Sequence, residues 1–168
     1  MFIYYYAISE NHSQKDTDAY IIKSAIDYAE KNDISCNIEV KRTSLGKPYI
    51  PGNAIYVGVT HTEKLLIIAV GDTEFGIDCE KISRAINNPK RIIKKYFSTE
   101  EEKYVIDGRQ QNNERFLEIW VKKEAYLKFL GTGFADIKKA DTFKLPGVFE
   151  KIEKENYIIY VYNEKNLI

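Results

Sequence analysis

The 168 residues can bury one good hydrophobic core but not two large independent domains, and 44% hydrophobic with 30% charged residues are globular proportions that exclude disorder and fibrous repeats. The formal net charge is zero, which argues against a general nucleic-acid binder, because such proteins usually carry an excess of Lys and Arg. No apolar run approaches the roughly 20 residues of a membrane helix, and the opening residues lack a basic leader, so we expect neither a membrane segment nor export.

The first 80 residues have the pattern of a small sheet that carries one helix. Apolar residues recur at helical spacing after the first strand, and the Gly46-Lys47-Pro48 loop and the Pro51-Gly52-Asn53 turn interrupt the chain. Gly71-Asp72 should join the last two strands. The expected elements are a strand at 1–9, a helix at 17–31, a short strand at 37–41, and strands at 55–60, 65–70 and 75–80 in one antiparallel sheet.

The remaining residues begin with helix signals. Asn88 is a candidate cap before Pro89, and Ser98 opens a capping box for a helix that should end near residues 107–108. A longer helix is expected at 113–130, ended by Gly131, followed by strands at 140–145 and 156–162. The fold class is therefore α+β, with strands and helices in both halves of the chain.

Charge is distributed unevenly between the two halves. Residues 1–80 carry a net charge of minus five and residues 81–168 one of plus five, which suits two halves that meet over a polyanion, although a solvated surface could give the same count. Cys36 and Cys79 lack a metal-ligand spacing, so we expect reduced thiols and a cytoplasmic location.

Asp78 and Glu80 are the first candidate site residues. Two positions apart on a strand, their side chains point to the same face, and two neighbouring carboxylates repel each other unless a cation lies between them. Mg²⁺ commonly binds one or two carboxylates together with substrate phosphates. The alternative is the solvated edge of a strand.

Trp120, Glu124 and Lys128 form one row of the long helix at a spacing of four. A core tryptophan beside a surface Glu–Lys pair would explain this row without any function. However, a carboxylate on the row that carries apolar residues should be partly buried, and it then needs a cationic partner or a metal.

Thr60-His61-Thr62 ends a predicted strand, and Lys47 precedes it in the Gly-Lys-Pro loop. A histidine flanked by hydroxyls can bind phosphate through charge and hydrogen bonds. A histidine in a turn is more often a satisfied polar residue, so this pattern is weak on its own.

Taken together and in order, these motifs resemble the Sfp-type 4′-phosphopantetheinyl transferase family. The set spans roughly 90 residues in the middle of the chain, and chance recurrence at that density is improbable. The matching motifs are Gly46-Lys47-Pro48, Thr60-His61-Thr62, Gly76-Ile77-Asp78-Cys79-Glu80, Phe97-Ser98, Trp120-x-x-Lys123-Glu124-Ala125-x-x-Lys128 and Gly131-x-Gly133-Phe134.

The resemblance implies a pseudo-twofold arrangement of two similar α+β halves, 1–80 and 81–168, packed as one unit with coenzyme A in the cleft between them. It also implies one Mg²⁺ ion and a set of site residues. These are Asp78, Glu80 and Glu124 as metal ligands; Lys47, Thr60, His61, Thr62 and Lys123 as groups that bind coenzyme A; and Lys128 beside the diphosphate.

The implied activity moves the phosphopantetheine arm of coenzyme A to a serine of an apo acyl or peptidyl carrier protein, with a monomer as the working unit. Glu124 is the first candidate for the base and Glu101 the second. The residues that bind the 3′-phosphate stay open, since Lys15, Lys41 and Arg42 are candidates by charge only. The alternatives are a metal-dependent pyrophosphohydrolase and a noncatalytic protein that binds coenzyme A or a carrier.

Overall fold

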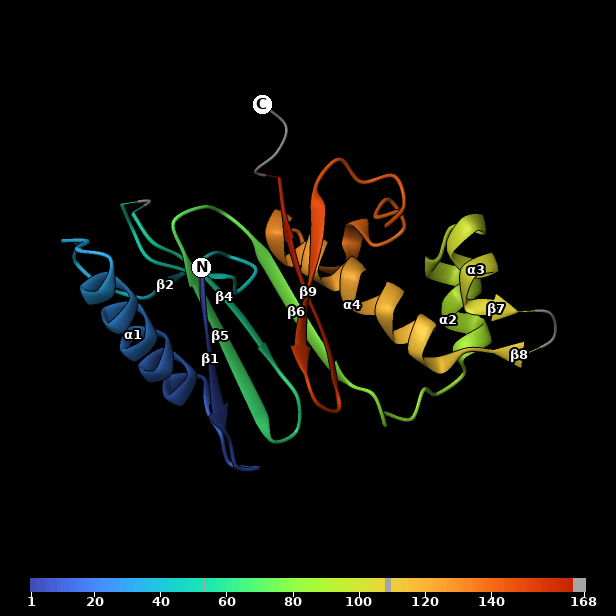
Figure 1. Cartoon of the computed structure of the whole chain (residues 1–168), viewed down its shortest axis with the longest axis horizontal. Coiled ribbons are helices and arrows are strands. Elements are labelled where there is room, and N and C mark those ends of the chain that lie inside the picture. The colour runs from blue at the N-terminus through green and yellow to red at the C-terminus, as the bar shows by residue number, and fades with distance from the viewer. Residues whose placement is uncertain (53, 108–109, 165–168) are drawn as a thin grey trace.

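Two three-stranded antiparallel sheets face each other, with α1 on one side and α4 on the other (Figure 1). The computed structural model describes residues 1–52, 54–107 and 110–164. The first sheet has the order β1 (Phe2–Ala7), β5 (Leu65–Gly71), β4 (Tyr56–His61), and the second has the order β6 (Gly76–Lys81), β10 (Tyr157–Asn163), β9 (Val148–Lys154).

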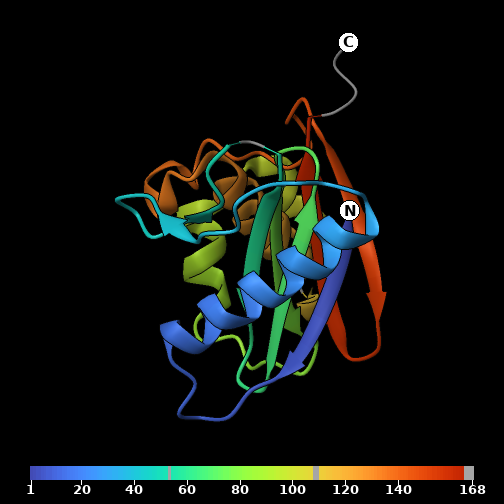
Figure 2. The same cartoon turned by 90° about the vertical axis from the view of Figure 1, so that its left-hand side faces the viewer.

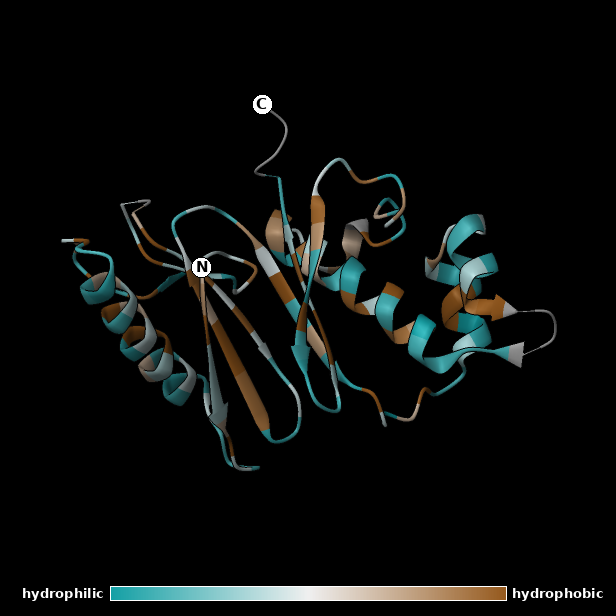
Figure 3. Ribbon diagram, in the orientation of Figure 1, coloured by the Kyte–Doolittle hydropathy of each residue, from teal (hydrophilic) through white to brown (hydrophobic). Residues whose placement is uncertain are grey.

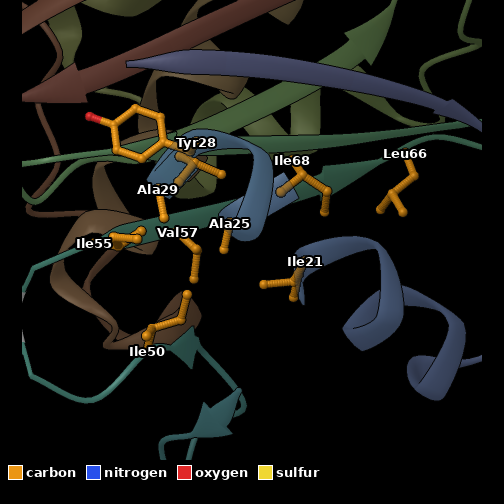
Figure 4. Close-up of a cluster of buried hydrophobic side chains, with 10 residues drawn as sticks. Ile21, Ala25, Tyr28, Ala29, Ile50, Ile55, Val57, Leu66 and Ile68 are labelled. Carbon is orange, nitrogen blue, oxygen red and sulfur yellow. The ribbon is translucent and has the colours of Figure 1, made fainter. Parts of the chain in front are cut away.

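α1 (Gln14–Lys31) covers the outer face of the first sheet. Ser13 and Asp16 form a capping box at its start, which satisfies amide groups that the first turn leaves unpaired. Figure 4 shows the core beneath the helix, where Ile21 and Ala25 meet alternate residues of β5, including Leu66 and Ile68. The helical spacing of the sequence therefore fixes which face of α1 is buried.

A second core fills the space between the two sheets. The residues of β5 that point away from α1, Ile67 and Ala69, pack there against Ile77, Cys79 and residues of β10. β5 is thus covered on both faces, which explains its continuous apolar run (brown in Figure 3).

Three α-helices belong to the C-terminal part: α2 (Pro89–Tyr96), α3 (Thr99–Val105) and α4 (Asn113–Leu130). α4 packs on β6 and β10, and Gly131 ends it in the left-handed conformation with φ 68°. A Cβ atom on Gly76 would lie 2.0 Å from the carbonyl oxygen of Ala125. Glycine at this position therefore lets the backbone of β6 reach α4.

Short elements complete the fold. β2 (Lys41–Arg42) and β3 (Pro48–Tyr49) form a hairpin, which Figure 2 shows projecting near the start of α1. β7 (Ile106–Asp107) pairs with β8 (Gln110–Gln111), and a 3₁₀ helix, η1 (Gly133–Asp136), follows α4. No helix in the described part of the chain is both long enough and apolar enough to cross a membrane.

The α+β class and most of the expected elements are confirmed, and three predictions are wrong. Residues 75–80 do form a strand, but β6 pairs with β10 rather than with β5, so it joins the second sheet although it lies within 1–80. The expected strand at 37–41 is reduced to Lys41–Arg42. The expected strand at 140–145 is a turn in which the amides of Lys144 and Leu145 donate to Asp141 O, and the strand begins at Val148 instead.

Two helix-end predictions also differ in detail. Asn88 precedes Pro89 as expected, but its φ is 51° and its side chain makes no capping hydrogen bond. The Ser98 capping box is confirmed, although α3 already ends at Val105. The expected turn residue Asn53 and the expected helix end at Gly108 lie outside the described residues. The pseudo-twofold relation of the two halves stays a prediction.

Candidate functional site

The candidate site lies where β4 and β6 run side by side. The hydroxyl of Thr60 on β4 donates to Asp78 Oδ1 at 2.9 Å and accepts from the amide of Cys79 at 3.2 Å. Thr60 thereby links the two strands and also holds one oxygen of the Asp78 carboxylate. Cys79 faces the opposite side, in the core between the sheets, as strand alternation predicts.

We call the junction of β4 and β6 at Thr60 and Asp78 the seam. Asp78 and Lys128 form its central ion pair. The Asp78 residue is 4% exposed, and its Oδ1 accepts a hydrogen bond from Lys128 Nζ at 2.6 Å. Lys128 also donates to the carbonyl of Val59 on β4 at 3.3 Å. The pair ties α4 to both strands and gives a buried carboxylate the cationic partner that it requires.

Glu124 lies one turn before Lys128 on the same helix. Burial raises its pKa to about 7, and repulsion from Asp78 adds to the increase, while Lys128, Arg84 and a hydrogen bond with Trp120 act in the opposite direction. Near neutral pH this carboxyl is therefore divided between its protonated and ionised forms. Such a group can exchange a proton under physiological conditions.

Glu80 lies on the same face of β6 as Asp78 and forms an ion pair with Arg84. Among the described residues, no three His, Cys, Asp or Glu side chains are grouped as a metal site. The set of Asp78, Glu80 and Glu124 as magnesium ligands therefore stays a prediction. Its chemistry fits a hard cation, because all three offer carboxylate oxygens and a cation would relieve the repulsion between Asp78 and Glu124.

Two hollows open beside the seam. One is a cavity of about 360 Å³ between the β2–β3 hairpin and α4, and the other is a groove of about 970 Å³ on the side of Glu80 and Arg84. His61 lines both, and Thr62 lines the groove. The polar residues that line the cavity are Arg42, Lys47, His61, Glu124 and Lys128.

Lys47 lines the cavity, but its amino group is already bonded within the protein. Lys47 Nζ donates to the carbonyl of Phe129 at 2.7 Å and to Glu74 Oε1 at 2.9 Å. It thus fastens the hairpin to the C-terminal end of α4, where a cation also interacts favourably with the helix dipole. Phosphate binding by Lys47 stays a prediction, alongside this structural role.

Lys123 is placed away from both hollows. Its side chain is 0% exposed, forms an ion pair with Glu101 at 2.8 Å and donates to the carbonyl of Ala140. Glu101 also accepts hydrogen bonds from the amide of Ser98 at 2.7 Å and from the amide and hydroxyl of Thr142 at 2.8 and 2.9 Å. This network joins α3, α4 and the turn at Thr142. Both side chains are buried in it, so Lys123 is not placed to bind coenzyme A and Glu101 is not placed to act as a base.

Sequence patterns indicated no role at the site for Arg84 and indicated one for Arg42 by charge alone. Arg84 lies four residues after Glu80 and forms an ion pair with it. Outside a helix, this spacing does not predict that two side chains meet. Arg42 was a candidate by charge only, and its place in the cavity depends on how the hairpin folds against α1 through Asp18. Neither arrangement follows from local sequence patterns.

Comparison with known proteins connects this site to one family. The model of the 4′-phosphopantetheinyl transferase superfamily matches residues 74–163, which include β6, α4 and the seam residues Asp78, Glu124 and Lys128. The chain is 29% identical over 100 residues to the 4′-phosphopantetheinyl transferase gsp of Aneurinibacillus migulanus, which covers 58% of this chain and 40% of that protein. It is 30% identical over 92 residues to a 4′-phosphopantetheinyl transferase of Bacillus subtilis, covering 54% and 40%.

The buried Lys123–Glu101 pair should matter for stability. Lys123→Met should lower the free energy of unfolding by about 3–5 kcal/mol, because it leaves Glu101 buried without its cation. Urea denaturation measures the change. Lys144→Met is the control, since the Lys144 side chain is 63% exposed and water screens its ion pairs, so its removal should change the free energy of unfolding far less. A loss below about 1 kcal/mol for Lys123→Met would contradict the structural role.

Glu124 should make stability depend on pH in metal-free protein. The folded state keeps a proton on Glu124 up to a pKa of about 7, whereas the unfolded state releases it near 4.5. The stabilisation by this proton is therefore complete below about pH 4.5 and is lost as the pH rises through 7, by at most about 3 kcal/mol. Urea titrations of wild type and Glu124→Gln in chelator should diverge over this range, whereas parallel curves would refute the shifted pKa.

Proposed function

Because the chain belongs to the 4′-phosphopantetheinyl transferase superfamily, we propose that it transfers the phosphopantetheine arm of coenzyme A to a serine of an apo acyl or peptidyl carrier protein. The observation that carries the proposal is the seam beside the cavity, where buried Asp78 and half-buried Glu124 and Lys128 come from strand and helix of the matched region. The aligned part covers 40% of each relative, so the activity of the whole protein is inferred.

The proposed reaction exchanges one phosphorus–oxygen bond for another. The serine hydroxyl oxygen attacks the phosphorus that carries the pantetheine arm, and the bond from this phosphorus to the bridging diphosphate oxygen breaks. Adenosine 3′,5′-bisphosphate leaves, and the serine proton passes to a base. Catalysis of such a transfer consists mainly of positioning and charge neutralisation.

Glu124 is our choice for the base. In the metal-free protein its pKa is raised to about 7, and a cation bound beside it would lower this pKa and keep the carboxylate ionised, as a proton acceptor must be. It also lines the cavity, as a base near the reacting atoms must. Glu101, the second candidate, is 0% exposed and accepts four hydrogen bonds, so a substrate hydroxyl could not reach it.

Lys128 and the carboxylates would divide the remaining tasks. Lys128 can neutralise the negative charge that develops on the leaving bisphosphate, because it lines the cavity and its side chain is only partly buried. Asp78, Glu80 and Glu124 would hold Mg²⁺, which when bound supplies Lewis-acid neutralisation of the diphosphate. In the structure Asp78 and Glu80 are instead paired with Lys128 and Arg84.

α2 is the surface that we propose for the carrier. Its basic residues Lys90, Arg91, Lys94 and Lys95 are all exposed, whereas Ile93 is buried and attaches the helix to the core. Carrier proteins of this kind are usually acidic, so charge complementarity would steer the encounter. The positive net charge of residues 81–168 acts in the same direction.

A mass measurement on carriers tests the proposal. After incubation with coenzyme A and Mg²⁺, an apo carrier should gain the mass of one phosphopantetheine group. Release of adenosine 3′,5′-bisphosphate without any carrier would support a pyrophosphohydrolase instead. Binding of coenzyme A with no product at all would support a noncatalytic binding protein.

The same assay tests Lys128. Lys128→Met should lower kcat by about 100-fold or more and change KM for coenzyme A by only a few-fold, because its charge is needed most as the bond breaks. Lys151→Met on β9 is the control, since that lysine is half exposed and lines neither hollow. A change confined to KM would show that Lys128 only binds the substrate.

A further inference from the structure

A turn directly after β6 folds Arg84 back onto Glu80. The amide of Arg84 donates to the carbonyl of Lys81 at 2.9 Å, which closes the turn. The amide of Ile82 donates at 3.0 Å to the carbonyl of Asn156, between β9 and β10, and fastens the turn to the second sheet. Arg84 Nη1 then forms its ion pair with Glu80 Oε1. The backbone of this segment therefore places the guanidinium at the carboxylate.

The charge of Arg84 reaches more than one of the proposed metal ligands. Glu80 is mostly buried, with a side chain 15% exposed, and it carries the direct ion pair. The positive charge of Arg84 also opposes the rise in the pKa of Glu124 that burial causes. Lys128 is paired with Asp78 at the same seam. Two cations thus compensate most of the charge of the three carboxylates that would receive a divalent ion.

The two cations differ in how readily they can leave. Lys128 Nζ is held by Asp78 Oδ1 at 2.6 Å and by the carbonyl of Val59 at 3.3 Å, and Asp78 is buried. Arg84 lines the open groove, and about half of its side chain is exposed. Water can therefore replace Glu80 as a partner of Arg84 at small cost. Arg84 is the cation that an incoming ion can displace.

We propose that Arg84 competes with the divalent ion for Glu80 and so lowers the affinity of the protein for that ion. The inference rests on the proposed function, which makes Glu80 a metal ligand. The guanidinium holds the Glu80 oxygen until an ion displaces it, and it then turns into the groove. A ligand that binds only one of two arrangements is weakened by the fraction of the protein in the other.

Titration with Mn²⁺, without coenzyme A or carrier, tests the competition, because electron paramagnetic resonance measures the free ion. Arg84→Met should bind Mn²⁺ at least about fivefold more tightly than wild type, the scale of a partly exposed ion pair. Lys81→Met is the matched control, since Lys81 lines the same groove and its loss changes the net charge equally. It should stay within about twofold of wild type. Equal tightening in both variants would overturn the competition.

A double variant shows whether Glu80 carries the effect. In a Glu80→Gln background, Asp78 and Glu124 still offer carboxylates to the ion, but the charge that holds Arg84 is gone. Arg84→Met should therefore change Mn²⁺ affinity by less than about twofold in this background. A change as large as that in the wild-type background would overturn competition at Glu80.

The transfer assay separates this inference from the proposed function. If wild type modifies a carrier but Arg84→Met binds Mn²⁺ no more tightly than wild type, the role of Arg84 fails alone. If no carrier gains mass and neither protein binds Mn²⁺, the proposed function and the inference both fail.

Discussion

The arrangement depends on one interaction, the contact of Lys128 with the buried carboxylate of Asp78 at the seam between β4 and β6. A carboxylate with 4% exposure would be costly without a partner, so its position on β6 requires a cation from α4 and a hydroxyl from Thr60 on β4. The same contact brings strand, strand and helix together beside the cavity. The side chains that stabilise this part of the fold are therefore also the ones proposed to act in the reaction.

Two further contacts in the C-terminal part fix the rotation of α4 about its own axis. Gly76 permits the close approach of β6 to the helix, and the Lys123–Glu101 network holds the opposite side of α4 to α3 and the 140–142 turn. Consecutive residues of one helix therefore have different tasks, with Lys123 fixed in the interior and Glu124 lining the cavity. From the first sheet, Lys47 and Arg42 bring the hairpin to the same cavity.

Local sequence patterns predicted the positions of helices and strands better than they predicted which strands pair with each other. The strand at 65–70, the Ser98 capping box and the helix ended by Gly131 are confirmed, because each depends on residues close in sequence. The pairing of β6 with β10 joins residues about eighty positions apart, and no periodicity in either strand specifies it. The resemblance implied Lys123 as a coenzyme ligand, but its buried ion pair with Glu101 gives it a structural role. The position of Arg42 depends on the fold of the hairpin against α1, which no local pattern specifies.

We propose that the seam of Asp78 and Glu124 receives a divalent ion together with the diphosphate of coenzyme A. A crystal structure of the protein with coenzyme A and Mn²⁺, whose anomalous scattering locates the ion, tests it most directly. We expect one peak within coordination distance of oxygens from both carboxylates and of the diphosphate. A structure with coenzyme A bound and no ion at the seam, or with Glu124 turned away from Asp78, would contradict the account.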